Sequence, residues 1–165
     1  MEGKKSKPRA ILVFGAPGSG KTTFAEKFVD KFDLTYYNLD ELKEKYQLSH
    51  DLIAKALEIV AKTGKTLVIE GGLDTEAERR EIRQAFRRVG YRVSLVWIQT
   101  DIATIRMRMK LRYKTVAEAK KIYDEAIETM EAPTAAEKPI ILSGKHTFET
   151  QMKHVLSGLA NAGKR

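Results

Sequence analysis

The chain contains no cysteine among its 165 residues. This absence excludes disulfide bonds and every metal site built from thiolates, and it is typical of a reducing compartment. The sequence also lacks a long hydrophobic run, since the apolar stretch AILVFGA is too short for a signal peptide or a membrane-spanning helix. We therefore expect a cytoplasmic protein with no membrane partner.

Internal repeats, long linkers and low-complexity stretches are absent from the sequence as well. A chain of 165 residues with a hydrophobic share of 42% is suited to one domain with a substantial core. We expect a flexible basic N-terminal tail over residues 1–8 and a single domain over residues 9–162. We also expect the protein to be a monomer.

Acidic residues are fewer than basic ones, 22 against 30, which gives a formal net charge of +8. A basic balance suggests anionic partners such as nucleotides, phosphorylated metabolites or nucleic acid. Part of the excess lies at the two ends of the chain, so the places where charge clusters are more informative than the total. The terminal basic residues are Lys4, Lys5, Lys7, Arg9, Lys164 and Arg165.

Segments typical of strands alternate with segments typical of helices along the whole chain. Strands are predicted at RAILVFG (9–15), LTYYNL (34–39), TLVIEGG (66–72), YRVSLVWIQ (91–99) and PIILSG (139–144). Helices are predicted between them and at the end of the chain. This alternation indicates an α/β fold with a parallel sheet covered by helices on both faces.

The stretch GAPGSGKT at residues 15–22 matches the phosphate-loop pattern G-x-x-x-x-G-K-[ST] and lies between a predicted strand and a predicted helix. Its glycines allow backbone N–H groups to surround phosphate oxygens, and the following helix directs its N-terminus at the same anion. We expect ATP and Mg²⁺ as cofactors, with Lys21 reaching the β- and γ-phosphates and Thr22 ligating the metal. The predicted cofactor-binding residues of the loop are Gly15, Ala16, Pro17, Gly18, Ser19, Gly20, Lys21, Thr22 and Thr23.

Several classes of nucleotide-binding protein are disfavoured by what surrounds this loop. The chain has neither the N-K-x-D motif nor the D-x-x-G motif expected of a GTPase. A motor or AAA+ ATPase would usually be longer and would show an apolar run ending in Asp-Glu, whereas TLVIEGG ends in Glu70 and two glycines. A small P-loop kinase remains.

Asp40 directly follows the second predicted strand, where a kinase would place a carboxylate beside the phosphate loop. Such a carboxylate orients the acceptor hydroxyl and accepts its proton, so Asp40 is a candidate catalytic residue together with Lys21. The alternative is that Asp40 caps the predicted helix DELKEKY at residues 40–46, and the two roles can coexist.

The densest positive charge lies between Arg106 and Lys121, with seven basic residues and one acidic residue. Arg108 and Arg112 are four residues apart and therefore share one face of a helix. We predict a mobile lid at about residues 106–132 whose arginines, Arg112 above all, stabilise the transferred phosphoryl group. A solvated helix face is the alternative. The apolar residues Met107, Met109 and Leu111 interleave with the basic ones, which favours a helix with one buried face.

The combination of GAPGSGKT, NLDELKEKY, VIEGGLDTEAERREIRQAFRRVGYRVSLVWI, IRMRMKLR and ETMEAPTAAEK resembles the polynucleotide-kinase-like branch of P-loop kinases. This group is labelled as AAA-domain proteins of the zeta-toxin and gluconate-kinase neighbourhood, and the resemblance covers about residues 9–160. It implies a five-stranded parallel sheet, with an ATP–Mg²⁺ site and an acceptor site on either side of the γ-phosphate.

On the acceptor side, the resemblance assigns Asp40 as the carboxylate that activates the hydroxyl. Polynucleotide-kinase-type members tend to carry D-x-x-R at this point, with the arginine gripping the acceptor phosphate. This chain has Lys43 at that position, and lysine binds phosphate as a point charge without a bidentate fork. We expect Asp40 and Lys43 to contact the acceptor.

On the nucleotide side, the resemblance places Glu70 where family members have a carboxylate or Asn that orders Mg²⁺ through water, although a surface acid is the alternative. It assigns Arg108 to stacking on adenine and Arg112 to the lid position that reaches phosphate. Lys145 and His146, in the last loop SGKHT, match the place where such kinases touch the adenine edge. His146 is equally compatible with an exposed loop histidine.

These residues predict an ATP-dependent phosphotransferase whose favoured acceptor is a polynucleotide 5′-hydroxyl. A small-molecule kinase acting on a sugar or nucleoside is the first alternative, and a phosphorylated small molecule is a further candidate partner. The second alternative is a nucleotide-binding switch, or a slow NTPase without a dedicated acceptor.

Overall fold

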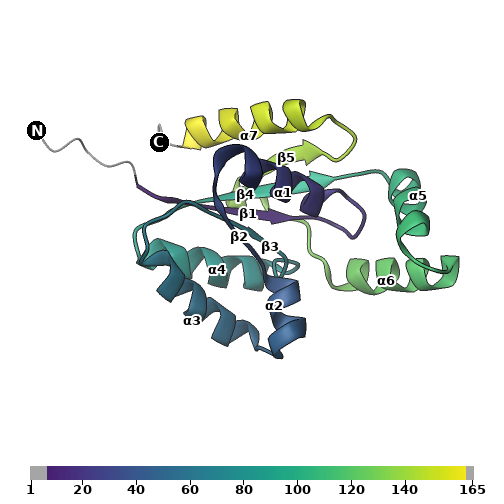
Figure 1. Cartoon of the computed structure of the whole chain (residues 1–165), viewed down its shortest axis with the longest axis horizontal. Helices are drawn as coiled ribbons and strands as arrows, with labels where there is room; N and C mark the ends of the chain where they lie inside the picture. The colour runs from purple at the N-terminus through teal and green to yellow at the C-terminus, as the bar shows by residue number, and fades with distance from the viewer. Residues whose placement is uncertain (1–6, 163–165) are drawn as a thin grey trace, which may run out of the picture.

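The computed structural model describes residues 7–162, so most of the tail expected at residues 1–8 lies outside the described part. Five parallel strands form one sheet in the order β2-β3-β1-β4-β5 (Figure 1). This confirms the predicted α/β fold with a five-stranded parallel sheet. The strands are β1 (Arg9–Phe14), β2 (Thr35–Asn38), β3 (Leu67–Glu70), β4 (Arg92–Gln99) and β5 (Ile140–Ser143).

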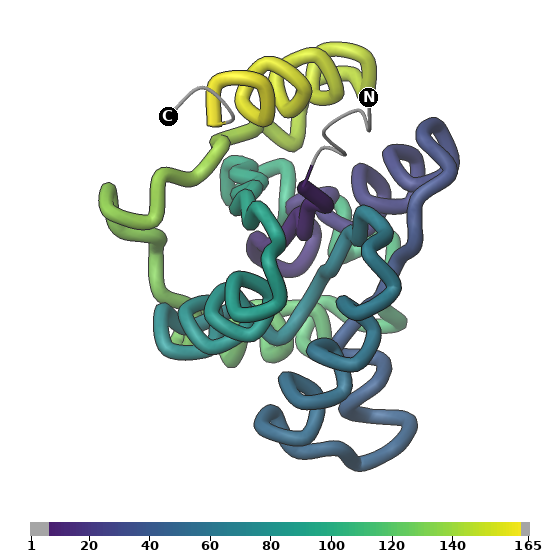
Figure 2. The backbone as a smooth tube through the Cα atoms, turned by 90° about the vertical axis from the view of Figure 1, so that its left-hand side faces the viewer, coloured from purple at the N-terminus to yellow at the C-terminus, as the bar shows by residue number. Residues whose placement is uncertain are grey.

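Helices cover both faces of the sheet because alternate residues of the central strands point to opposite sides. Ile11 and Val13 of β1 pack towards α1 (Lys21–Phe32) and α7 (Phe148–Ala162). Leu12 and Phe14 pack on the other face in a core that includes residues of α2 (Leu39–Tyr46), α3 (His50–Ala61) and α4 (Glu76–Arg88). Figure 2 shows α2 and α3 projecting at the lower end.

The predicted lid consists of α5 (Ile102–Arg112) and α6 (Val116–Thr129), followed by a short 3-10 turn at Ala135–Glu137. Asp101 caps α5 by accepting a hydrogen bond from the amide of Thr104 at 2.9 Å. The two helices lie beside the carboxyl ends of β1 and β4 (Figure 1). Among the described residues, no helix is long and apolar enough to cross a membrane.

The lid helix α5 buries fewer apolar residues than the sequence predicted. Ile105 and Met109, four residues apart, are buried against Ala16 of the phosphate loop. Met107 and Leu111 are 58% and 84% exposed, so the expectation that they help to form a buried face was wrong. The reason is geometric, because a short helix packed on one side can bury only one stripe of residues spaced three or four apart.

Candidate active site

The phosphate loop leads directly from β1 into the first turn of α1. Gly20 occupies the N-cap position with φ of 99°, and no side chain caps the helix there. Gly15 is required by close packing, because a Cβ at this position would lie 2.5 Å from the carbonyl oxygen of Ile98. The first-turn N–H groups of α1 therefore have no side-chain partner from the cap, which is the arrangement that binds phosphate at a helix N-terminus.

Thr22 and Glu70 are brought together at the centre of this site. The hydroxyl of Thr22 donates to Glu70 Oε1 at 2.5 Å, and the hydroxyl of Tyr36 donates to Glu70 Oε2 at 2.8 Å. Glu70 is 2% exposed, so the alternative of a surface acid is wrong. Burial raises the pKa of Tyr36 above its usual value, and the hydrogen bond to Glu70 raises it further.

The residues present at this point suit a magnesium ion. Mg²⁺ prefers oxygen ligands and is usually bound by one or two protein groups together with substrate phosphates and water. A threonine hydroxyl beside a buried carboxylate supplies that chemistry, and the phosphates would come from ATP. Among residues 7–162 no group of three or more His, Cys, Asp or Glu side chains could hold a metal without such help.

Asp40 lies in the first turn of α2, but it is not the residue that caps this helix. Asn38 is the cap, because its side-chain oxygen accepts from the amides of Asp40 and Glu41 at 3.1 and 3.2 Å. The alternative reading of Asp40 as the cap is therefore wrong. Its carboxylate instead accepts a hydrogen bond from the amide of Gly72 at 2.9 Å.

Gly71 is adapted to the carboxylate of Asp40. Its φ is 77°, and a side chain at Gly71 would collide with that carboxylate. Gly71 and Gly72 directly follow Glu70, so Asp40 is held against the loop that continues from the candidate magnesium site. The structure thus places the predicted catalytic carboxylate next to the end of β3.

Asp74 is a candidate site residue that the sequence analysis missed. Burial raises its pKa, and the like charges of Asp40 and Glu78 raise it further, while Lys21 and Lys43 act in the opposite direction. Asp74 therefore lies within the electrostatic reach of both the phosphate-loop lysine and the predicted catalytic carboxylate. Its position, four residues beyond Glu70 in a loop, was the available signal.

Lys43, predicted to contact the acceptor, forms an ion pair across to α4. Its Nζ lies 3.6 Å from Glu78 Oε1. Glu78 also accepts from the amides of Asp74 and Thr75, both at 3.1 Å, and so closes the capping box of α4. Burial alone would raise the pKa of Glu78, but the Thr75 amide, Lys43 and His50 together outweigh burial and lower it.

Arg108 reaches from α5 to the phosphate loop. Its guanidinium donates to the carbonyl oxygens of Gly18 and Ser19 at 3.2 Å and of Gly144 at 2.8 Å. It borders a cavity of about 300 Å³ that also includes Thr23 and His146. With Gly20, the cavity brings together four of the residues assigned to the nucleotide. The lining residues are Gly20, Thr23, Phe24, Lys27, Arg108, Gly144, His146, Phe148 and Gln151.

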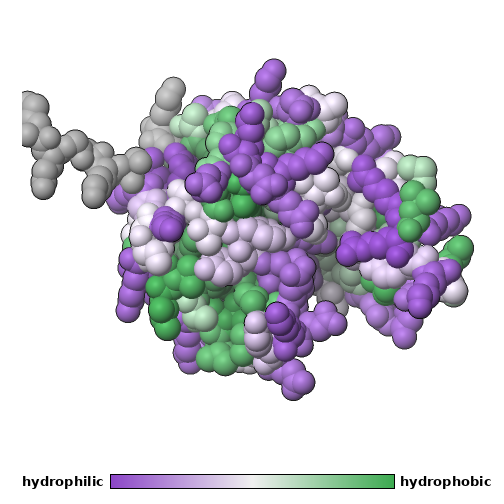
Figure 3. Space-filling view, in the orientation of Figure 1, coloured by the Kyte–Doolittle hydropathy of each residue, from purple (hydrophilic) through white to green (hydrophobic). Residues whose placement is uncertain are grey.

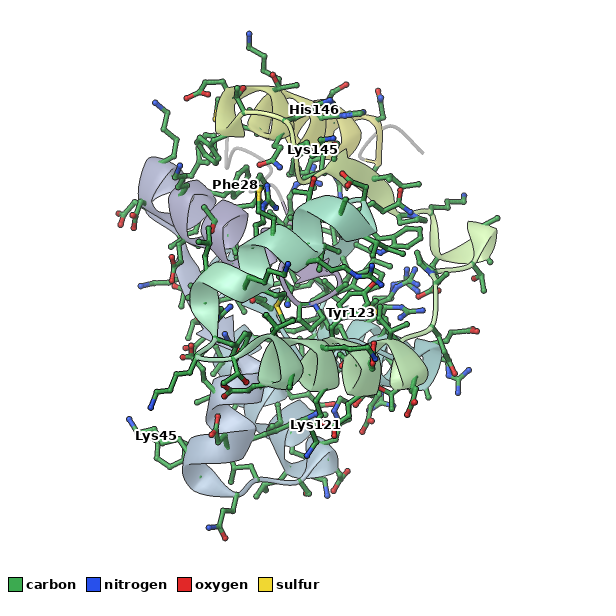
Figure 4. All side chains as sticks on the ribbon, turned by 90° about the vertical axis from the view of Figure 1, so that its right-hand side faces the viewer. Phe28, Lys45, Lys121, Tyr123, Lys145 and His146 are labelled. Carbon is green, nitrogen blue, oxygen red and sulfur yellow. The ribbon has the colours of Figure 1, made fainter. Side chains whose placement is uncertain are left out.

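Lys145 and its neighbour His146 line different cavities. Figure 4 shows both in the loop between β5 and α7, but Lys145 pairs with Asp101 at 3.3 Å. The amide of Thr104, the largest cause, lowers the pKa of Asp101 to about 2. Lys145 borders a different cavity of about 650 Å³, between β4, β5 and α6, which Tyr123 also lines.

The basic residues of the lid are mostly directed to solvent, and Figure 3 shows a largely hydrophilic surface over this part of the molecule. Lys120 and Lys121 pair with acidic residues one turn further along α6. Arg112, the last residue of α5, is exposed, and its guanidinium lies 6.0 Å from the ring centre of Tyr113. Its assignment to phosphate stays a prediction.

Comparisons with known proteins identify the family of the chain and proteins that share its fold. A family model described as an AAA domain matches residues 11–136. The chain is 26% identical over 161 residues to human adenylate kinase isoenzyme 1, covering 86% of this chain and 83% of that protein. It is 28% identical over 120 residues to cytidylate kinase from Staphylothermus marinus, covering 68% of this chain and 63% of that protein.

Solved structures of kinases share the fold. A sugar kinase from a Janibacter species superposes with a TM-score of 0.73 at 22% identity, covering 93% of this chain and 95% of that one. A gluconokinase from Sinorhizobium meliloti has a TM-score of 0.67 at 17% identity, covering 95% and 94% respectively. At these identities the likeness concerns the fold.

Proposed function

The chain belongs to the AAA domain family and is an ATP-dependent kinase of the P-loop type, and on this premise we propose that it phosphorylates a hydroxyl of a small molecule. The observation that carries the proposal is the arrangement at the carboxyl ends of three adjacent strands. The phosphate loop follows β1, Asp40 follows β2 and Glu70 ends β3. The loop that would bind the phosphates of ATP and a candidate proton acceptor for the hydroxyl thus lie at the same edge of the sheet, on either side of β3.

In the proposed reaction, Asp40 orients the acceptor hydroxyl and accepts its proton as the oxygen attacks the γ-phosphorus. The bond to the β-phosphate oxygen breaks, and ADP leaves. Lys21 stabilises the negative charge on the β- and γ-phosphates, and Thr22 would hold Mg²⁺, with Glu70 fixing the Thr22 hydroxyl. When bound, Mg²⁺ neutralises charge on the phosphate oxygens.

Charge on the acceptor side favours a neutral acceptor over a phosphorylated one. Asp40 and Asp74 have no ion pair within 4 Å in the described part of the chain, whereas Lys43 is already paired with Glu78. An incoming phosphate group would meet two carboxylates and a lysine whose charge is shared. A sugar, polyol or nucleoside would meet hydrogen-bond acceptors suited to hydroxyl groups.

A polynucleotide 5′-hydroxyl, the acceptor favoured by the sequence, is the second candidate. The observation in its favour is the exposed basic surface of α5, where Arg106, Lys110 and Arg112 have no ion pair among the described residues. Such a surface could follow a nucleic-acid backbone. The comparisons name adenylate, cytidylate and sugar kinases, so this candidate depends on the lid alone.

The test is transfer of labelled γ-phosphate from ATP with Mg²⁺ to three acceptor sets, with Lys21→Ala as the blank. The sets are neutral sugars and nucleosides, nucleoside monophosphates, and 5′-hydroxyl DNA and RNA oligomers. Label on a sugar or nucleoside supports the proposal. Label confined to oligomers supports the second candidate, and label on monophosphates contradicts the charge argument. ATP consumption without a labelled acceptor indicates a hydrolytic switch.

A further inference from the structure

Helix α4 buries one charged side chain, Arg79, beside its apolar residues. Arg79 is 0% exposed, and its guanidinium makes five hydrogen bonds. Nε and Nη2 donate to the carboxylate of Glu137 at 2.8 and 3.1 Å. Nη1 donates to the carbonyl oxygens of Leu73, Asp74 and Glu131, each at 3.0 Å. Every partner is outside α4.

These partners belong to two segments that are far apart in the sequence. Leu73 and Asp74 continue from the glycine pair that holds Asp40. Glu131 comes two residues after α6 ends at Thr129, where the lid returns to the sheet. Arg79 therefore contacts both the acceptor-side loop (residues 71–76) and the lid-return segment (residues 130–137).

The two segments also bind each other beside the guanidinium. The amide of Glu131 donates to the carbonyl oxygen of Asp74 at 2.8 Å. The carboxylate of Glu131 accepts from the amide of Glu76, in the first turn of α4, at 2.7 Å. Each of these contacts spans more than 50 residues of sequence, so the lid-return segment is joined to the loop at several points.

Holding α4 on the sheet does not require a buried arginine. Ile82, Ala85 and Phe86 on the same helix are buried and provide that packing. A buried ion pair adds little net stability compared with apolar residues of similar volume. What the planar guanidinium adds is directional bonding to a carboxylate and three carbonyl groups, with its face 4.8 Å from the ring centre of Phe14.

We propose that Arg79 is a positioning residue that makes the acceptor-side loop and the lid-return segment move as one unit. The N-terminal side of the lid is held separately by the phosphate loop, because Thr100, two residues before α5, donates to the carbonyl oxygen of Ser19 at 2.9 Å. When α5 and α6 move over ATP, the chain pivots at Glu131. The hydrogen bond from the Glu131 amide to the Asp74 carbonyl then passes this movement to the acceptor-side loop. Closure of the nucleotide side thereby sets the position of the loop that holds Asp40. This inference rests on the proposed kinase function.

The experiment measures amide hydrogen exchange with and without a non-hydrolysable ATP analogue and Mg²⁺, in the full chain. In the wild type, the analogue slows exchange in the phosphate loop and also in residues 73–76 and 130–137. Arg79→Lys keeps the charge but cannot bridge both segments. In this variant the protection of the phosphate loop remains, while that of residues 73–76 falls by about fivefold or more. Arg80→Lys, an exposed neighbour, behaves as the wild type.

Glu131→Ala provides a second variant should Arg79→Lys fold poorly, because Glu131 is exposed and only its bond to the Glu76 amide is lost. Its protection at residues 73–76 falls by a smaller factor. Wild-type protection confined to the phosphate loop overturns the inference, as does full protection of residues 73–76 in both variants. Absence of protection in the wild-type phosphate loop overturns the proposed function, and this inference with it.

Discussion

Thr22 Oγ1 and Glu70 Oε1 lie 2.5 Å apart, and this contact joins the first turn of α1 to the end of β3. Tyr36 completes the arrangement from β2 by donating to the second oxygen of Glu70. Three adjacent elements of the fold therefore meet at one buried carboxylate. This is the point at which the phosphates and the metal would be held.

Replacing Glu70 with Gln should reduce transfer and raise the Mg²⁺ concentration needed for half-maximal rate. An amide offers one acceptor oxygen where the carboxylate offers two, so one of the two hydroxyl groups loses its partner, at a cost of about 1–3 kcal/mol. We expect a loss of about tenfold or more in rate, measured across a magnesium titration. Tyr36→Phe is the comparison, and it should leave the magnesium requirement near that of the wild type. An unchanged titration in Glu70→Gln would contradict the metal role.

Removing Arg112 should reduce transfer more than it reduces ATP binding. The prediction follows from its place at the end of α5, where a cation can stabilise charge that develops during transfer. The measurement compares the dissociation constant of an ATP analogue with the transfer rate in Arg112→Ala. Arg106→Ala is the matched control, because it removes another exposed arginine of α5. Equal losses in both variants would show a general effect of charge.

Asp74→Asn should stabilise the fold at neutral pH. Burial raises the pKa of Asp74 above the ordinary 3.8, so its ionised form is less favourable in the folded chain than in the unfolded chain. The loss of folding stability caused by ionised Asp74 is complete above its folded-state pKa. It disappears as the pH falls below 3.8, the ordinary pKa of the side chain. Thermal unfolding from pH 7 to pH 3 should show a higher Tm for the variant at pH 7 and a shrinking difference at acid pH. A constant difference would contradict the assigned shift.

The phosphate loop and the order of strands and helices could be predicted because their signals are local. GAPGSGKT carries its own chemistry, and alternating apolar patterns need no knowledge of distant residues. The position of Asp40 was predictable for the same reason, since it follows a strand, while its catalytic role stays a prediction. Its competing reading as a cap failed because Asn38, two residues earlier, has the better geometry to accept the first amides of α2.

Arg79 was missed because its partners are distant in the sequence. Among the many charged residues of EAERREIRQAFRR it looks like part of a solvated face. One signal was present in the spacing, since Arg79, Ile82 and Phe86 lie on one helical stripe, and a stripe shared with two apolar residues favours burial. Glu137, 58 residues away, could not be matched to it without the fold.

If the chain transfers phosphate to a hydroxyl through Asp40, loss of that carboxylate should stop transfer and spare ATP binding. Asp40→Asn and wild type are measured side by side for the affinity of an ATP analogue and for γ-phosphoryl transfer to the best acceptor. The exposed neighbour Glu41→Gln serves as the control. We expect analogue affinity within about threefold of the wild type in both variants, and transfer reduced by about 100-fold or more in Asp40→Asn alone. Retained transfer in Asp40→Asn, or an equal loss of binding and transfer, would contradict this role of Asp40.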